Sequence, residues 1–346
     1  MRELKILAVV VVLTLITYWG VEPFAHSQMH PHVDPANYNF EQADKVSAKE
    51  KVEEKKEALE KAEAEAKKTG NEKVTHLPKK EYDAAVKFQK RIDSFWESNN
   101  ATLKLKGNAT NGATLVQSNC TACHSIKSQG FPQVMDDASS AAAYGVVPPD
   151  LSTSGKLYTK DYLVAFIKEP TLGQKVSHKF VDGRVHPMPS YSWMQPQDIA
   201  DMVAYLQSIA PDKMTDKQVF QDACQRCHGI KYGDMKGGTM SAHTPAENIK
   251  AYMGKVPPDL SQYIRSRGAK YLHEFINDPQ KHLEGTAMPR VGLSKASEEK
   301  VISYLEKVGD SKKAQREELG PKFLIYLVIF AIFAWLWKAS KWRDIH

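Results

Sequence analysis

Two apolar runs, residues 6–19 and 323–337, lie near the two ends of the chain. Both predict membrane-spanning helices, although the first is a little short of the roughly 20 residues that cross a bilayer. The first run leads into Tyr18-Trp19-Gly20-Val21-Glu22-Pro23 rather than into the small residues of a cleavage site, which favours an uncleaved anchor. Basic residues precede the first run and follow the second, which predicts that both ends are cytoplasmic and that the residues between them face the opposite compartment. These basic residues are Arg2, Lys5, Lys338, Lys341 and Arg343.

The segment 41–69 is dominated by Glu, Lys and Ala. Pairs such as Glu57/Lys61 and Glu63/Lys67 have the i,i+4 spacing of oppositely charged neighbours on a helix. The segment predicts a solvated helix within a spacer, residues 23–100, that has no chemistry of its own. The His30/His32 pair in the same spacer is interpreted as a polar membrane-exit segment rather than as a metal site.

Residues 101–211 and 212–312 form an internal repeat. In each copy a helical stretch leads into Cys-x-x-Cys-His, and then follow a Val-Pro-Pro-Asp-Leu-Ser string, an amphipathic helix, a Met-Pro pair and a closing helix with Tyr-Leu. Such self-similarity indicates two copies of one structural unit. The helical periodicity predicts an all-α fold, with helices at 111–118, 160–167 and 198–208 in the first copy and at 215–223, 270–276 and 298–308 in the second.

All four cysteines fall in the two Cys-x-x-Cys-His motifs, as Cys120/Cys123 and Cys224/Cys227. The three chemistries to weigh are a redox disulfide, a four-cysteine zinc site and covalent haem attachment, and the histidine after each second cysteine favours haem. Zinc ribbons separate their cysteine pairs by about 15–20 residues, whereas Cys123 and Cys224 are 101 apart. The motifs predict two covalently attached haem c groups.

His124 and His228 are the predicted axial nitrogen ligands of the two irons. An electron carrier has a six-coordinate iron, and Met188 and Met288 are predicted to supply the second axial ligand because they occupy matching positions in the repeat. Met194 competes with Met188 for this role. The histidines that could give bis-histidine ligation do not match between the copies and are interpreted mostly as surface residues: His178, His186, His273 and His282.

The Pro-Pro-Asp-Leu strings predict a supporting contact for each ligand histidine. A metal-bound histidine donates its other ring N–H to an acceptor, and the carbonyls of Pro149 and Pro258 are the proposed acceptors. Leu151 and Leu260 are predicted to pack on the haems. Three arginines near these motifs are either partners of the haem propionates or surface residues: Arg184, Arg226 and Arg290.

With both faces of each iron ligated, no open position remains for a substrate. The chain is therefore predicted to transfer electrons rather than to act as an enzyme on its own. The formal charge of +6, from 47 basic and 41 acidic residues, is too even to predict nucleic-acid binding.

The chain resembles the dihaem cytochrome c subunit of bacterial ubiquinol–cytochrome c reductase. The likeness rests on the start Tyr18-Trp19-Gly20-Val21-Glu22-Pro23-Phe24-Ala25-His26-Ser27, the Pro-Pro-Asp-Leu-Ser strings and the terminal anchor ending Lys341-Trp342-Arg343-Asp344-Ile345-His346. The tandem of haem motifs and the charged spacer depart from the commonest form of that subunit, which has one haem. The tandem leaves open which haem would face the electron donor.

This resemblance implies two tandem class I cytochrome c domains, 101–211 and 212–312, in the periplasm between inner-membrane anchors at 1–22 and 313–346. Cytochrome b and a Rieske iron–sulfur protein would be the partners, with a soluble cytochrome c or a terminal oxidase as the acceptor. One alternative is the dihaem subunit of a cbb-type haem–copper oxidase. A dihaem peroxidase is a second alternative, against which the paired Met-Pro motifs count.

Overall fold

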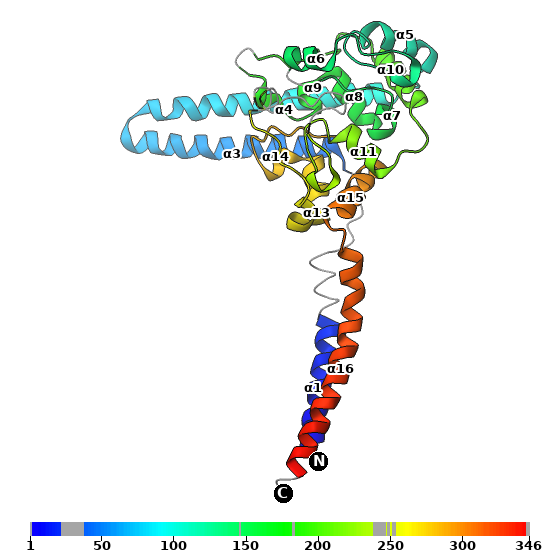
Figure 1. The fold of residues 1–346 in the computed structure, drawn as a ribbon. Helices are drawn as coiled ribbons and strands as arrows, with labels where there is room; N and C mark the ends of the chain where they lie inside the picture. Colours follow the sequence, from blue (N-terminus) through cyan, green and yellow to red (C-terminus); the bar gives the residue numbers. More distant parts are fainter. Residues whose placement is uncertain are drawn as a thin grey trace.

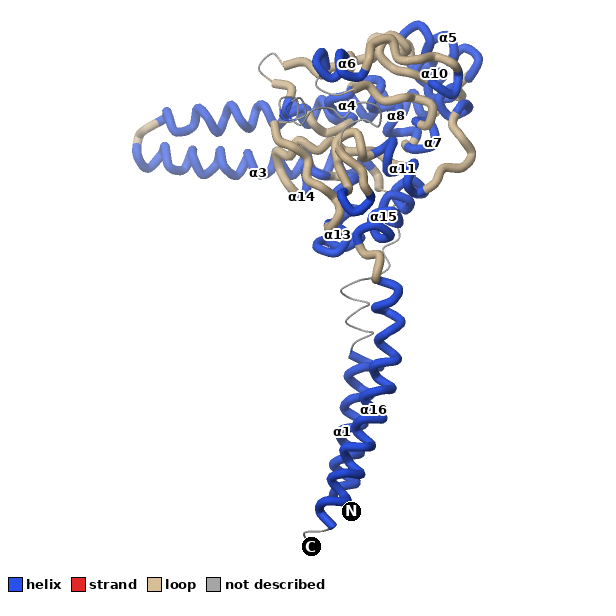
Figure 2. Tube along the Cα trace, in the orientation of Figure 1, coloured by secondary structure: helices blue, strands red, loops and turns tan. Residues whose placement is uncertain are grey.

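The computed structural model describes residues 2–21, 38–144, 147–181, 184–237, 247, 250 and 254–343. In these ranges the chain forms helices, turns and three isolated β-bridges, without extended strands (Figure 2). The predicted all-α fold is confirmed for this part of the chain. The pairs His30/His32 and the terminal Asp344-Ile345-His346 lie outside the described residues.

Each copy of the repeat places a helix before its Cys-x-x-Cys-His motif and a longer helix at its end, as the periodicity predicted. In the first copy the helices are α5 (Ala109–Asn119), α6 (Asp137–Tyr144), α7 (Ser154–Leu157), α8 (Lys160–Lys168), α9 (Pro170–Gly173) and α10 (Pro196–Ile209). In the second copy they are α11 (Asp216–Ala223), α13 (Tyr263–Asn277), α14 (Pro279–His282) and α15 (Lys295–Gly309).

In the first copy, α5 packs closely against α10 because Gly112 has no side chain. A Cβ at this position would lie 1.9 Å from the backbone oxygen of Asp201. The side chain of Asp201 accepts hydrogen bonds from the Asn108 N–H and the Asn111 Nδ2, both at 2.7 Å, so the start of α5 is tied to the middle of α10. This crossing fixes the helix that leads into the first cysteine motif.

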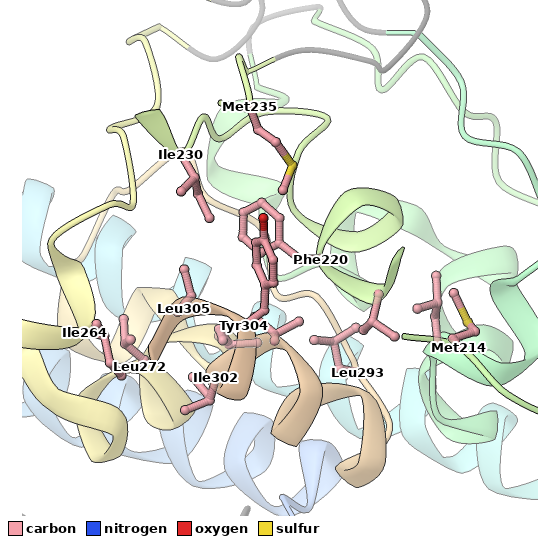
Figure 3. Packing of buried hydrophobic residues seen from close by; sticks show 14 residues of the cluster. Met214, Phe220, Ile230, Met235, Ile264, Leu272, Leu293, Ile302, Tyr304 and Leu305 are labelled. Atoms are coloured by element: carbon pink, nitrogen blue, oxygen red, sulfur yellow. The ribbon is translucent and has the colours of Figure 1, made fainter. Parts of the chain in front are cut away.

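In the second copy, α11 packs on α15 through an aromatic pair. The rings of Phe220 and Tyr304 lie 5.2 Å apart at the centre of the core, with Ile230 and Met235 on one side (Figure 3). Phe220 is fully buried. The start of α11 is fixed by a capping box, in which the side chains of Thr215 and Gln218 each bond the other residue's backbone N–H.

The charged segment forms one arm of a helical hairpin. Helix α3 (Phe40–Thr69) ends at Gly70, whose φ of 67° turns the chain, and α4 (His76–Leu103) returns beside it (Figure 1). The base of the hairpin is a third hydrophobic cluster, which contains Phe40, Ala48, Ile92 and Trp96 together with Tyr162, Ala165 and Leu172 of the first copy. The predicted helix over 41–69 is confirmed, but the segment is a solvated spacer only beyond this base.

The two copies of the repeat join through a short backbone pairing. Ser294 N–H donates to the Leu157 carbonyl at 2.7 Å, and Thr159 N–H donates to the Gly292 carbonyl at 3.0 Å. Tyr158, between these two contacts, packs against all three hydrophobic clusters. The hairpin and both copies therefore share one continuous packed interior.

The two terminal helices run side by side away from the repeats (Figures 1 and 2). Helix α1 (Arg2–Leu15), followed by a π-helical turn at Ile16–Val21, contacts α16 (Lys313–Arg343) through a 2.7 Å ion pair between Glu3 and Lys338. Among the described residues, one segment, Lys322–Arg343, is long and apolar enough to cross a membrane. The predicted N-terminal span does not meet that criterion, because 14 α-helical residues rise about 21 Å against a hydrocarbon core of about 30 Å.

Candidate functional site

Both Cys-x-x-Cys-His motifs occupy a tight turn at the end of a helix. Cys120 and Cys224 are the C-cap residues of α5 and α11, and their carbonyls accept the N–H of His124 at 2.8 Å and of His228 at 2.9 Å. A two-sided backbone pairing follows each motif, between Ile126 and Phe131 and between Ile230 and Met235. The same local geometry is therefore built twice.

Each motif histidine contacts the proline carbonyl that the sequence analysis proposed. The distance from His124 Nδ1 to the Pro149 oxygen is 2.8 Å, and His228 Nδ1 lies 2.8 Å from the Pro258 oxygen. Because a carbonyl can only accept, Nδ1 must be the protonated nitrogen, which leaves the lone pair on Nε2. Burial lowers the pKa of both imidazoles and favours the neutral form that binds a metal.

The aspartates of the Pro-Pro-Asp-Leu-Ser strings hold the proline carbonyls in place, a role that the sequence analysis missed. Asp150 accepts hydrogen bonds from Ser125 Oγ at 2.6 Å, Lys127 N–H at 3.1 Å and Ser152 N–H at 2.8 Å. In the second copy, Asp259 accepts from Lys231 N–H at 2.9 Å and Ser261 N–H at 3.0 Å. The repetition of Asp two residues before Ser in both strings was the available signal, since this spacing is typical of an Asx-turn.

The leucine and serine of each string complete this clamp. Leu151 N–H donates to the Ser125 carbonyl at 2.9 Å, and Leu260 N–H donates to the Gly229 carbonyl at 2.8 Å. Both leucines pack, half-buried, against the core of their own copy. Ser152 Oγ and Ser261 Oγ accept the N–H groups of Ser128 and Tyr232. Each string is thereby bonded to the turn that carries the motif histidine.

The cysteines suit covalent attachment better than zinc binding. Burial raises the pKa of Cys120 and Cys224 to about 12 and also raises that of Cys227, so these buried side chains are neutral thiols. Within the described residues, no three His, Cys, Asp or Glu side chains are grouped to hold a metal ion. Haem attachment remains the chemistry that fits the donor set of two thiols and one neutral imidazole.

The predicted methionine ligands are half-buried. Met188 packs against the edge of the first core, while the competing Met194 lies within that core at 8% exposure and fits a packing role. In the second copy, Met288 N–H donates to Thr286 Oγ1 at 3.4 Å. The axial role of Met188 and Met288 stays a prediction.

The alternative histidines have other partners. His178 Nε2 lies 3.2 Å from the Thr286 carbonyl, and the His282 ring meets the Tyr271 ring edge-on and lies tilted to the Phe275 ring. His186 Nδ1 lies 3.0 Å from the Met188 carbonyl. His273 is buried and hydrogen-bonds Glu298, so it is not among the surface histidines. The burial of His273 could not be predicted from the sequence, because its partner Glu298 is 25 residues away.

The three arginines near the motifs differ in their surroundings. Arg184 is exposed. Arg226, between Cys224 and Cys227, extends to the first copy and donates from Nη2 to the Val147 carbonyl at 2.9 Å. Arg290 is 1% exposed and pairs with Asp44 of α3, so it is not a surface residue.

The family model for cytochrome c matches residues 109–210 and again residues 217–309, which together make up more than half of the chain. The chain belongs to the cytochrome c family. Cytochrome c domains bind haem c covalently and transfer electrons, and each match contains one complete Cys-x-x-Cys-His motif. The chain is thus a multi-domain cytochrome c.

Curated relatives are distant. The ammonia monooxygenase gamma subunit of Nitrosomonas europaea is 23% identical over 205 residues, which cover 40% of this chain and 88% of that protein. A cytochrome c-553-like protein of Synechocystis is 25% identical over 107 residues, covering 31% of this chain and 74% of the relative. Among solved structures, a chain titled "Hyperthermophilic respiratory Complex III" is 21% identical with a TM-score of 0.30, and the match covers 38% of this cytochrome c and 75% of that chain.

Proposed function

We propose that this cytochrome c is a membrane-anchored dihaem subunit of a quinol–cytochrome c reductase. It accepts electrons from a Rieske iron–sulfur protein beside cytochrome b and passes them to a periplasmic cytochrome c or a terminal oxidase. The observation that carries this proposal is the pair of equivalent Cys-x-x-Cys-His turns, each with its histidine bonded to a proline carbonyl, within one packed body. A fixed pair of sites suits a relay between two partners.

Haem bound at each site supplies an iron that changes between the ferrous and ferric states. Cys120 and Cys123 would hold it in the first domain, and Cys224 and Cys227 in the second, through thioether bonds to the porphyrin. His124 and His228 would each bind an iron through Nε2, with the ring direction fixed by the proline carbonyls. Met188 and Met288 would complete the coordination and raise the potentials relative to a nitrogen ligand.

The contact between the two sites supports passage of electrons from one domain to the other. Arg226, inside the second cysteine motif, bonds the carbonyl of Val147, two residues before the proline that supports His124. Burial lowers the pKa of His124, and the positive charge of Arg226 lowers it further. The ligand turns of the two domains therefore lie within electrostatic reach of each other.

The position at the membrane is part of the proposal. The helix Lys322–Arg343 would span the inner membrane, with Lys338, Lys341 and Arg343 at its cytoplasmic end. Helix α1 would accompany it, with the π-helical turn at Ile16–Val21 extending its apolar length. The haem domains would then lie in the periplasm.

Copurification tests the assignment of partners. The full chain, tagged in its native host and extracted in mild detergent, should bring down a cytochrome b and a Rieske protein. A variant that stops before Lys313 is the matched control, because it keeps both cytochrome domains and loses α16. Recovery of a copper-containing oxidase instead would overturn the reductase assignment, and turnover of hydrogen peroxide by the purified chain would overturn a purely electron-transferring role.

A further inference from the structure

A buried arginine follows the predicted methionine ligand of the second domain. Arg290, two residues after Met288, is 1% exposed. Its guanidinium donates to both carboxylate oxygens of Asp44, from Nη1 at 3.0 Å and from Nη2 at 2.5 Å. Nε donates to the Asn277 carbonyl at 3.1 Å, and the group lies 4.8 Å from the centre of the Phe40 ring. The helical hairpin thus reaches into the methionine segment of the second domain.

The backbone of the same segment is held by the first domain. Arg290 N–H donates to the Gln174 carbonyl at 2.9 Å, and the Tyr162 hydroxyl donates to the Arg290 carbonyl at 3.2 Å. Gly292 has a φ of +66°, and a Cβ on it would lie 2.0 Å from the Tyr162 ring. Residues 290–292 are therefore fixed by all three parts of the molecule.

A second ion pair stands beside the first. Lys175 Nζ lies 2.7 Å from Asp278 Oδ2 and 3.7 Å from Asp44 Oδ1, and Asp278 also accepts from the Tyr38 hydroxyl at 2.9 Å. Two carboxylates thus face two cations at the junction, so the buried charges balance. Removal of any one of these charged groups would leave its partner buried and unpaired, which is strongly destabilising. The ion pairs therefore hold the hairpin and the two domains in one arrangement.

The position in the first domain that matches Arg290 makes a different contact. The residue two positions after Met188 is Ser190, whose hydroxyl donates to the Lys168 carbonyl at 2.6 Å inside the same domain. The hairpin therefore acts on the methionine segment of the second domain through a side chain that the repeat does not share.

We propose that Asp44 is a positioning residue for the second haem: through Arg290 it holds the Met288 segment where the thioether ligates the iron. This inference rests on the proposed axial role of Met288. A methionine thioether is an axial ligand that raises the potential, and its hold on the iron depends on the chain that presents it. Loosening the segment two residues away therefore weakens ligation at one haem and leaves the other unchanged.

The experiment uses the full-length, haem-loaded protein in detergent with two readouts. Carbon monoxide binding to the reduced protein reports a displaceable axial ligand, and an optical redox titration reports the two midpoint potentials. The variants are Asp44→Asn, Asp44→Glu and Tyr162→Phe. Glu41→Gln is the matched control, because Glu41 lies on the same helix and bonds Lys45 and Asn100 within the hairpin.

In the wild type and in Glu41→Gln, neither haem should bind carbon monoxide. In Asp44→Asn, one haem should bind it and one midpoint potential should fall, and this haem should be the one whose band Met288→His shifts. Asp44→Glu should restore ligation in part. Tyr162→Phe, which keeps the packing and removes one hydrogen bond, should lower the same potential by less.

Two results would overturn the proposal in different ways. If Asp44→Asn folds and both it and Tyr162→Phe match the wild type, or if both potentials fall together, the hairpin does not position Met288. If the wild type itself binds carbon monoxide at the haem of the second domain, Met288 is not its ligand, and the proposed ligation fails together with this inference. Should Asp44→Asn fail to fold, the Tyr162→Phe titration decides.

Discussion

Asp150→Asn should destabilise the first cytochrome domain and alter its haem alone. The carboxylate of Asp150 accepts three hydrogen bonds, from Ser125, Lys127 and Ser152. An asparagine keeps one oxygen, which can still accept from Ser152. Its amide nitrogen would then face the Lys127 N–H, so that two donors meet.

The size of the effect follows from these contacts. Hydrogen bonds to a charged group contribute about 1.5–3 kcal/mol each, and bonds that share one carboxylate are not additive. Losing the charge and one partner should therefore cost about 2–4 kcal/mol. For a chain of 346 residues, with an unfolding entropy of about 2.1 cal/mol/K per residue, that corresponds to a melting temperature lower by about 3–6 °C.

Calorimetry of the haem-loaded protein in detergent measures this change, and Asp212→Asn, an exposed aspartate between the two domains, is the control. A redox titration should show a shift of one midpoint potential, because the Pro149 carbonyl that orients His124 is released. Asp259→Asn should shift the other potential. If Asp150→Asn melts at the same temperature as Asp212→Asn and both midpoint potentials are unchanged, the hydrogen bonds of Asp150 do not support His124.

Two further variants and one titration test the junction of the three parts. Gly292→Ala should destabilise the protein more than Gly285→Ala in thermal melts, because both positions have positive φ but only Gly292 places a Cβ against Tyr162; equal losses would refute the close packing. Burial alone would raise the pKa of Asp278, but Lys175 and its other partners hold it below the ordinary value of 3.8. Its stabilising contribution is then complete above that value and is lost as the pH falls through the lower folded-state pKa, so Asp278→Asn should flatten the acid limb of stability against pH. Lys168→Met should lower the melting temperature less than Lys168→Ala, because methionine keeps most of the packing of the buried aliphatic part of the lysine side chain. The Lys168 ammonium bonds Ser98 and Thr102, and an equal loss of stability in both variants would show that these hydrogen bonds dominate.

The features of the site that repeat in the sequence could be predicted from it. Two matched strings of Val-Pro-Pro-Asp-Leu-Ser, at similar distances from two Cys-x-x-Cys-His motifs, were enough to propose which carbonyl each histidine contacts. The structure brings both pairs together at 2.8 Å. Local order is predictable here because each contact joins segments within one copy of the repeat.

The contacts that occur once were missed. Phe40, Asp44 and Ala48 form a stripe at i,i+4 spacing on the base of α3, but the stripe is short and the rest of the helix is charged. From the sequence, Asp44 cannot be told apart from the solvent-exposed acidic residues of the same helix, because its partner Arg290 is 246 residues away. A single long-range ion pair leaves no periodic signal in the sequence.

The basic residues near the two ends of the chain predict the orientation of the terminal helices in a membrane, but they do not predict how long each helix is. Basic residues precede the first apolar run and follow the second, yet the α-helical part of the first run ends at Leu15. Helix α1, although short, lies beside α16 along its length (Figure 1) and forms an ion pair with it through Glu3 and Lys338. A hydropathy profile cannot predict that contact, because it treats each segment of the sequence separately.

Haem stoichiometry tests the central claim most directly. Intact-protein mass spectrometry of the denatured holoprotein, combined with haem quantification, should give two covalently attached haems per chain. The double variants Cys120→Ser/Cys123→Ser and Cys224→Ser/Cys227→Ser should each retain one. A wild-type chain with a single attached haem, or a double variant that keeps both, would contradict the account of two equivalent sites.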